Sequence, residues 1–160
     1  MPAERDTVLL VCSGNTCRSP MAAALLRAAL AKEGGRLAAL RVESRGLAAL
    51  PGQPASPNAV RALRPIGLAL ADHSSRPLDQ ADLDRAAAVL VMGSGHLRAL
   101  REGAERLPEL TALFRGHLPE GKGREIPDPF GGDLAEYEAC RDSMIEAMPG
   151  ILAILRERLA

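Results

Sequence analysis

The chain has 160 residues, 47 % of them hydrophobic, and its 20 Lys and Arg balance its 20 Asp and Glu. This composition excludes a disordered chain, and a net charge of zero excludes a global field that would attract nucleic acid or an anionic membrane. No apolar run reaches the length of a membrane span, and the N-terminus does not resemble a signal peptide. We expect one domain over residues 1–160, with no cofactor or metal. Three cysteines, an odd number without zinc spacing, indicate a reducing, cytoplasmic compartment.

The N-terminal segment predicts a strand, a loop and a helix in that order. Residues 7–12 form a continuous apolar run, which is typical of a buried parallel strand. Residues 13–17 then predict a loop. Ser19-Pro20 predicts a helix start, with Ser19 as N-cap, and Gly34-Gly35 should end that helix.

Strands and helices alternate along the rest of the chain. Buried strands are predicted at residues 40–44, at 87–92 and within 109–114, and helices from Ser56-Pro57 to 64, at 79–85, at 94–101 and from Asp133 onward. Pro149-Gly150 should kink or break the last helix. This order predicts an α/β fold, a three-layer sandwich in which helices cover both faces of a four-stranded parallel sheet. The loop after the first strand would then lie at the carboxyl edge of the sheet, where such folds bind ligands.

That loop has the features of an anion site for one phosphate group. A sharp turn from strand into helix directs backbone N–H groups inward, and the helix N-terminus adds partial positive charge. Arg18 offers a planar fork of donors for two phosphate oxygens. Gly14 allows close approach of the backbone, and Asn15 tolerates a left-handed conformation.

Cys12 stands at the end of the predicted strand, facing this loop. A lone cysteine in a strand is usually a core residue. Here, however, the donors that would hold phosphate also stabilise a thiolate, and Ser19 could donate to the sulfur. Cys-x5-Arg-Ser between a buried strand and a helix therefore indicates a nucleophile.

The stretch VCSGNTCRSP, residues 11–20, resembles the active-site loop of the low-molecular-weight protein phosphatases. Ser44-Arg45-Gly46 stands where that family usually has Ser-Ala-Gly, and His73-Ser74-Ser75 resembles its His-x-Ser segment. IPDPFGG, residues 126–132, resembles its Asp-Pro loop. Alone, an Asp before a Pro would indicate only a turn. Together, the two distant motifs in the right order favour membership of this family.

The resemblance implies a metal-independent hydrolysis through a cysteinyl-phosphate, with phosphorylated proteins as partners and inorganic phosphate as product. Cys12 would be the nucleophile, Arg18 would bind the phosphoryl oxygens, and Asp128 would act as general acid and then general base. The other expected site residues are Ser13, Gly14, Asn15, Thr16, Cys17, Ser19 and Phe130 for phosphate or substrate binding, with Ser44 and His73 supporting the loop.

The family also suggests a role for Cys17, because the corresponding cysteine can trap an oxidised nucleophile as a disulfide. We therefore predict Cys12 as the reactive thiol and Cys17 as its redox partner. The alternative is that Cys17 only packs. Cys140 is expected to be a small core residue, and His96 and His117 are expected to face solvent.

Two phosphatase branches of the family compete as models for the substrate. The phosphotyrosine branch typically has an aliphatic residue at the Thr16 position, whereas the phosphoarginine branch resembles this chain in Thr16 and in Asp-Pro-Phe-Gly-Gly at residues 128–132. A hydroxyl suits a polar guanidinium, and a phenyl ring would favour aromatic walls. We favour phosphoarginine, with phosphotyrosine as the alternative in which Thr16 is neutral filler.

Two further alternatives are weaker. Thiol arsenate reductases share the loop, but they need further cysteines to relay a disulfide, and residues 18–139 contain none. A non-catalytic anion-binding or redox-sensing module would have no need of the intact pair Cys12 and Asp128.

Overall fold

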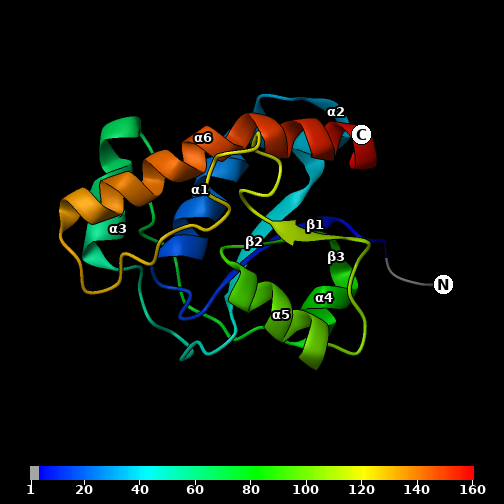
Figure 1. Cartoon of the computed structure of the whole chain (residues 1–160), viewed down its shortest axis with the longest axis horizontal. Coiled ribbons are helices and arrows are strands. Elements are labelled where there is room, and N and C mark those ends of the chain that lie inside the picture. Colours follow the sequence, from blue (N-terminus) through cyan, green and yellow to red (C-terminus); the bar gives the residue numbers. More distant parts are fainter. Residues whose placement is uncertain (1–3) are drawn as a thin grey trace.

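Four parallel strands form one sheet in the order β2-β1-β3-β4 in the computed structural model, which describes residues 4–160 (Figure 1). The strands are β1 (Thr7–Cys12), β2 (Arg41–Gly46), β3 (Ala86–Val91) and β4 (Leu110–Leu113). The two central strands, β1 and β3, are almost entirely buried, as their continuous apolar sequences require. In the register of the sheet, Cys12 pairs with Gly46, so both residues end their strands at the carboxyl edge.

Helices cover both faces of this sheet. The helices α1 (Arg18–Ala31), α2 (Gly35–Ala39), α3 (Pro57–Leu63) and α6 (Leu134–Leu159) lie on one face, and α4 (Gln80–Arg85) and α5 (Ser94–Gly103) on the other (Figure 1). A 3-10 turn, η1 (Arg64–Ile66), follows α3. The predicted α/β three-layer sandwich is therefore confirmed. No helix within residues 4–160 is both long and apolar enough to cross a membrane.

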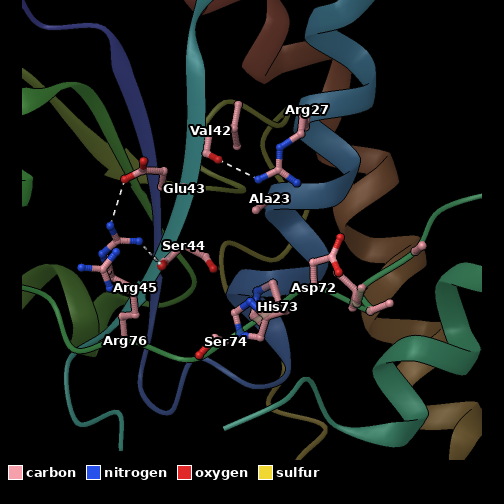
Figure 2. A pocket seen from close by; sticks show the side chains of 14 residues that line it. Ala23, Arg27, Val42, Glu43, Ser44, Arg45, Asp72, His73, Ser74 and Arg76 are labelled. Carbon is pink, nitrogen blue, oxygen red and sulfur yellow. Dashed lines mark hydrogen bonds and ion pairs between the residues drawn. The ribbon is translucent and has the colours of Figure 1, made fainter. Parts of the chain in front are cut away.

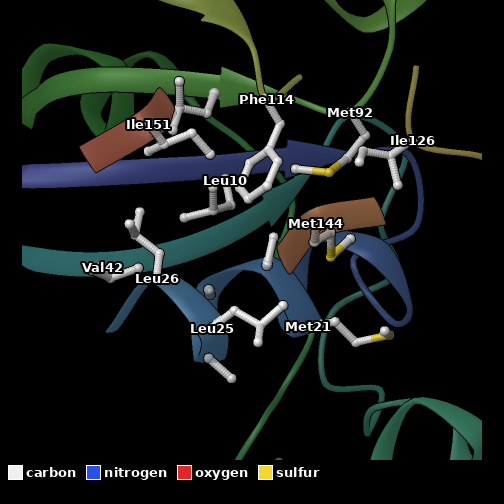
Figure 3. Close-up of a cluster of buried hydrophobic side chains, with 14 of the residues drawn as sticks. Leu10, Met21, Leu25, Leu26, Val42, Met92, Phe114, Ile126, Met144 and Ile151 are labelled. Carbon is white, nitrogen blue, oxygen red and sulfur yellow. The ribbon is translucent and has the colours of Figure 1, made fainter. Parts of the chain in front are cut away.

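The larger of the two cores lies under α1 and α6 and anchors the region of the Asp-Pro segment (Figure 3). Phe114, Met92 and Ile126 pack here with almost no exposed surface. The backbone N–H of Ile126 donates to the carbonyl of Met92 at 2.8 Å, directly after β3. This bond and the burial of Ile126 fix residues 126–132 beside the carboxyl edge of the sheet.

Several predicted helix starts differ from the structure. The helix predicted to begin after Ser19 begins at Arg18, with Cys17 in the N-cap position and no side-chain cap. Ser56 occupies the N-cap position of α3 but does not cap it, because its hydroxyl bonds elsewhere. By contrast, Asp133 caps α6 as predicted, and Asp79 forms a full capping box with Asp82 at α4, which was not predicted. The short helix α2 was not predicted.

The sequence predicted a kink or a break at Pro149, and the break is wrong, because α6 continues through it to Leu159. Pro149 is exposed, so the carbonyl oxygen of Ile145, which loses its N–H donor, lies on the solvent side of the helix. Met144 and Ile151, on either side of the proline, are fully buried. Packing on the core side therefore holds the two halves of the helix together.

Candidate active site

The loop after β1 lies where the order of the sheet reverses. Helix α1 follows β1 on one face, and helix α5 follows the neighbouring strand β3 on the other face (Figure 1). The two chain directions separate at this point and leave a crevice at the carboxyl ends of the strands. The residues expected to form the site meet at this crevice.

Cys12 is buried at the end of β1, and polar groups surround its sulfur. The backbone N–H of Asn15 donates to Sγ at 3.3 Å, and Ser19 Oγ lies 3.0 Å from Sγ. The side-chain amide of Asn15 donates to Ser19 Oγ at 2.8 Å, so the hydroxyl proton is free to point to the sulfur. Its other acceptor, the carbonyl of Arg45, is farther away at 3.4 Å. The sulfur thus has two hydrogen-bond donors within reach, a backbone N–H and a hydroxyl.

Asn15 holds the loop in shape. It is fully buried and has a φ of 58°, a left-handed conformation that asparagine tolerates. Its side-chain amide nitrogen also donates to Ser44 Oγ at 2.9 Å, and its side-chain oxygen accepts from the backbone N–H of Arg76 at 2.9 Å. Its carbonyl accepts from His73 Nε2 at 2.6 Å. Burial lowers the pKa of His73, which favours the neutral ring with its proton on Nε2.

A cavity of about 550 Å³ lies behind this network, between α1, β2 and residues 69–76 (Figure 2). Ser44 and His73 line it from the loop side. Arg27 also lines it and donates to the carbonyl of Val42 at 2.7 Å. Cys12 and Arg18 do not line this cavity, so it is separate from the crevice where the sulfur lies.

A second cavity, of about 270 Å³, is lined by the loop itself. It is lined by Cys12, Ser13, Gly14, Asn15, Thr16, Cys17, Arg18, Ala48, Asp128 and Phe130. All the residues expected to bind phosphate or substrate, except the buried Ser19, therefore face one space. Phe130 is 76 % exposed and stands at its mouth.

Arg18 connects the loop with the Asp-Pro segment. It is largely buried and donates from Nη1 to the carbonyl of Ile126 at 3.1 Å. Its Nη2 lies 3.6 Å from Asp128 Oδ2. The other carboxylate oxygen of Asp128 accepts from the backbone N–H of Phe130 at 3.1 Å, while 55 % of the Asp128 side chain stays exposed. A carboxyl group, a guanidinium and the Cys12 sulfur thus lie at one cavity, with the first two in contact.

Cys17 has its own partners on the side of α3 and α6. Its buried sulfur lies 3.0 Å from Ser56 Oγ and 3.2 Å from the hydroxyl of Tyr137. Burial raises the pKa of Tyr137 to about 12, so this hydroxyl keeps its proton. Sequence reasoning missed both partners, although Tyr137 is the single tyrosine of the chain. Cys140 is buried in the core as expected, and burial raises its pKa to about 12.

The departure from Ser-Ala-Gly at Arg45 has a structural partner. Arg45 is buried and pairs with Asp82, Nε to Oδ2, at 3.1 Å, and with Glu43, Nη2 to Oε2, at 2.9 Å. Gly46, the next residue, lies so close to the loop that a Cβ would stand 2.5 Å from the carbonyl oxygen of Ser13. The end of β2 therefore supports the loop directly.

His96 is half-buried, whereas the prediction placed it facing solvent. Its Nε2 lies 2.9 Å from Ser13 Oγ, and its Nδ1 is the one buried side-chain polar atom without a hydrogen-bond partner in residues 4–160. Burial, and then the charge of Arg18, lower its pKa. The sequence signal for this contact is weak: His96 lies in the first turn of the helix that follows the strand next to β1.

Comparison with known proteins shows one family. Residues 7–160 match the family described as low molecular weight phosphotyrosine protein phosphatase. A protein-arginine-phosphatase of Geobacillus stearothermophilus is 39 % identical over 137 residues, covering 86 % of this chain and 87 % of that protein. A low molecular weight protein-tyrosine-phosphatase of Streptomyces coelicolor is 36 % identical over 158 residues, covering 95 % and 94 %.

A solved structure of the arginine phosphatase YwlE is also similar. It is a mutant in which a serine replaces a cysteine, with that active-site serine phosphorylated. Its TM-score is 0.85 at 31 % identity, and the match covers 96 % of this chain and 97 % of that one.

Proposed function

This chain belongs to the low molecular weight protein phosphatase family and is a protein phosphatase, and we propose that it hydrolyses phosphoarginine in proteins through a cysteinyl-phosphate. One observation carries the proposal: the Cys12 sulfur lies among the donors of a phosphate-sized loop, and Arg18 and Asp128 line the same cavity. The proposed nucleophile Cys12, the phosphate-binding Arg18 and the proton donor Asp128 thus line one cavity.

In the first step, the Cys12 thiolate attacks phosphorus, and an S–P bond forms as the bond from phosphorus to the leaving nitrogen breaks. Asp128, protonated, gives its proton to that nitrogen, so the arginine leaves as a neutral base or, after solvent protonation, as a guanidinium. Arg18 and the amides of residues 13–18 stabilise the charge on the three phosphoryl oxygens.

In the second step, water attacks the cysteinyl-phosphate. The Asp128 carboxylate takes a proton from the water, a P–O bond forms, and the S–P bond breaks to release inorganic phosphate. Ser19, 3.0 Å from the sulfur, stabilises the departing thiolate. Asp128 then carries the proton for the next cycle. In the YwlE mutant, phosphorylation of a serine that replaces a cysteine is consistent with such an intermediate in that protein.

The lining of the cavity supports phosphoarginine over phosphotyrosine. Its single aromatic side chain is Phe130, which is mostly exposed at the mouth, so the described residues provide no deep slot for a phenyl ring. Thr16 contributes a half-buried hydroxyl, and Asp128 a carboxylate, both of which can accept from guanidinium N–H groups. Phosphotyrosine is the second candidate, because both activities occur among relatives of similar identity.

Redox control by Cys17 and a cytoplasmic setting belong to the same proposal. A peroxide would convert the Cys12 thiolate to a sulfenic acid, and attack by the Cys17 thiol would form a disulfide and release water. The three cysteines are free thiols, which suits a reducing compartment.

The test is kcat/KM on matched peptides that carry phosphoarginine or phosphotyrosine. Thr16→Val removes the hydroxyl at nearly constant shape, and Thr16→Ser keeps it as a matched control. We expect the wild type and Thr16→Ser to prefer phosphoarginine, and Thr16→Val and Thr16→Ile to lose that preference. A wild-type preference for phosphotyrosine would refute the substrate assignment while leaving the mechanism intact.

A further inference from the structure

The contact between Ser13 and His96 crosses the crevice at the carboxyl edge of the sheet. Ser13 is the first residue of the loop after β1, and His96 lies in the first turn of α5, after β3. The two side chains meet through Ser13 Oγ and His96 Nε2 at 2.9 Å. On its other side the loop is held by the network around Asn15. The loop is thus held at its entrance by a helix on the opposite face of the sheet.

The helix turn that carries His96 is itself fixed to the Asp-Pro segment. Glu125 accepts from the backbone N–H of Ser94 at 2.9 Å and from its hydroxyl at 2.6 Å. Glu125 is three residues before Asp128. His96 therefore lies where the loop, α5 and the segment that carries the expected acid meet.

The unpartnered Nδ1 of His96 makes this position unusual. A buried polar atom without a hydrogen bond costs free energy, so such an atom beside a ligand site calls for an explanation. We propose that His96 is a positioning residue for phosphate binding, which fixes the entrance of the loop by holding the hydroxyl of Ser13. The inference rests on the proposed phosphatase chemistry but holds for either substrate.

The charged groups around the His96 ring should link its protonation to phosphate binding. The charged groups that act on His96 are Arg18 from the loop side and Glu125 and Asp128 from the Asp-Pro segment. Burial and Arg18 lower the pKa of His96, whereas the two carboxylates raise it. A phosphate anion in the loop would offset the charge of Arg18 and add an anion nearby. Phosphate binding should therefore favour the protonated ring, and a protonated ring should bind phosphate more tightly.

The first experiment follows the three histidines by NMR in the wild type, with and without inorganic phosphate. Single variants of each histidine assign the three ring signals. We expect saturating phosphate to move the titration midpoint of His96 upward, while the ring signals of the exposed His117 do not respond to phosphate. A His96 midpoint that does not respond to phosphate would overturn the proposal, and this measurement needs no variant to be active.

The second experiment measures the Kd of inorganic phosphate directly in a matched pair of variants. His96→Gln places an amide where Nε2 lies and can still reach Ser13, whereas His96→Asn is one methylene shorter and cannot. We expect His96→Asn and Ser13→Ala each to weaken phosphate binding about 2- to 10-fold, the range of one hydrogen bond. The double variant should be no weaker than either, because the two residues act as one unit.

His96→Gln should bind phosphate like the wild type at neutral pH but lose the extra affinity that the wild type gains as His96 protonates. His117→Asn is the control for removing a histidine, and it should change neither quantity. Unchanged Kd in His96→Asn, or additive losses in the double variant, would overturn the role through Ser13. Because the probe is the reaction product, a failed phosphoarginine assay would leave these outcomes interpretable.

Discussion

Replacing Gly46 with alanine tests how tightly the end of β2 sets the position of the phosphate loop. A Cβ at this position would lie 2.5 Å from the carbonyl oxygen of Ser13 and 3.0 Å from Cβ of Asn15. Ordinary contacts of a Cβ begin at 3.4 Å. The loop would therefore have to move by the difference, about 0.9 Å, because the first atom it meets is backbone and cannot rotate away.

A displacement of this size should reduce kcat as well as the melting temperature. Misplacement of a reacting group by about 1 Å can cost about 10²-fold in rate, and Ser13 and Asn15 are the residues that place the amides around Cys12. We therefore expect Gly46→Ala to lower kcat for hydrolysis of an aryl phosphate about 10²-fold. The assay is steady-state kinetics, with thermal unfolding measured alongside.

Gly103→Ala is the matched control, because nothing lies within 4 Å of a Cβ built at the end of α5. Its kcat should stay within about twofold of the wild type. If Gly46→Ala keeps kcat within about threefold and melts like the wild type, the loop has room to move without loss of function. That result would show that β2 does not fix the loop.

Three other perturbations address the acid, the buried ion pair and the tyrosine. Asp128→Asn should lower kcat about 10²- to 10⁴-fold, the range of general acid-base catalysis, and retained kcat would remove this residue from the mechanism. Asp82→Ala removes one of the two partners of the buried Arg45 and should lower the free energy of unfolding in urea by about 3 kcal/mol, the lower end of the usual range because Glu43 remains. Replacing both Arg45 and Asp82 by apolar residues should cost much less. Tyr137 titrates with a pKa of about 12 when folded, against about 10 in the unfolded chain, so absorbance at pH 11 should show roughly a tenth of it ionised in the native protein and most of it ionised in denaturant. Because the folded pKa is the higher one, this group should reduce stability as pH rises above about 10, and equal ionisation in the two states would contradict the burial argument.

The core of the fold and of the site could be predicted because their signals are local. The apolar run before Cys12 and the turn residues Gly14 and Asn15 stand together in ten residues. A buried strand followed by a helix N-terminus places these groups without help from distant parts of the chain. Asp128 is different, because only the family resemblance linked it to Arg18, more than a hundred residues earlier. In the structure, the hydrogen bond from Ile126 to Met92 holds the Asp-Pro segment at the end of β3, and Arg18 contacts both Ile126 and Asp128 there.

The incorrect predictions for polar side chains share one physical cause, which is hydrogen bonding to residues outside their own helices. Ser19 and Ser56 have the sequence context of helix caps, yet the hydroxyl of Ser19 bonds in the Cys12 and Asn15 network, and that of Ser56 contacts the Cys17 sulfur. A capping bond contributes about 1 kcal/mol, so a buried polar atom that needs a partner outweighs it. His96 was assigned to solvent for the same reason, since its contact with Ser13 spans 83 residues.

These long-range bonds explain how the loop can serve successive chemical states. During turnover the groups in the loop would change from thiolate to cysteinyl-phosphate to free phosphate, while the amides must keep the same orientation. A flexible loop would have to be ordered at each step, and that entropy would oppose phosphate binding. Here Asn15 is fully buried and forms hydrogen bonds with Ser19, Ser44, His73 and Arg76. Gly46 lies so close to the backbone of Ser13 that even a Cβ would clash with it. The conformational entropy of the loop is therefore lost when the chain folds and not when phosphate binds. The donors are then already oriented toward the charge that would develop in the transition state of the proposed reaction.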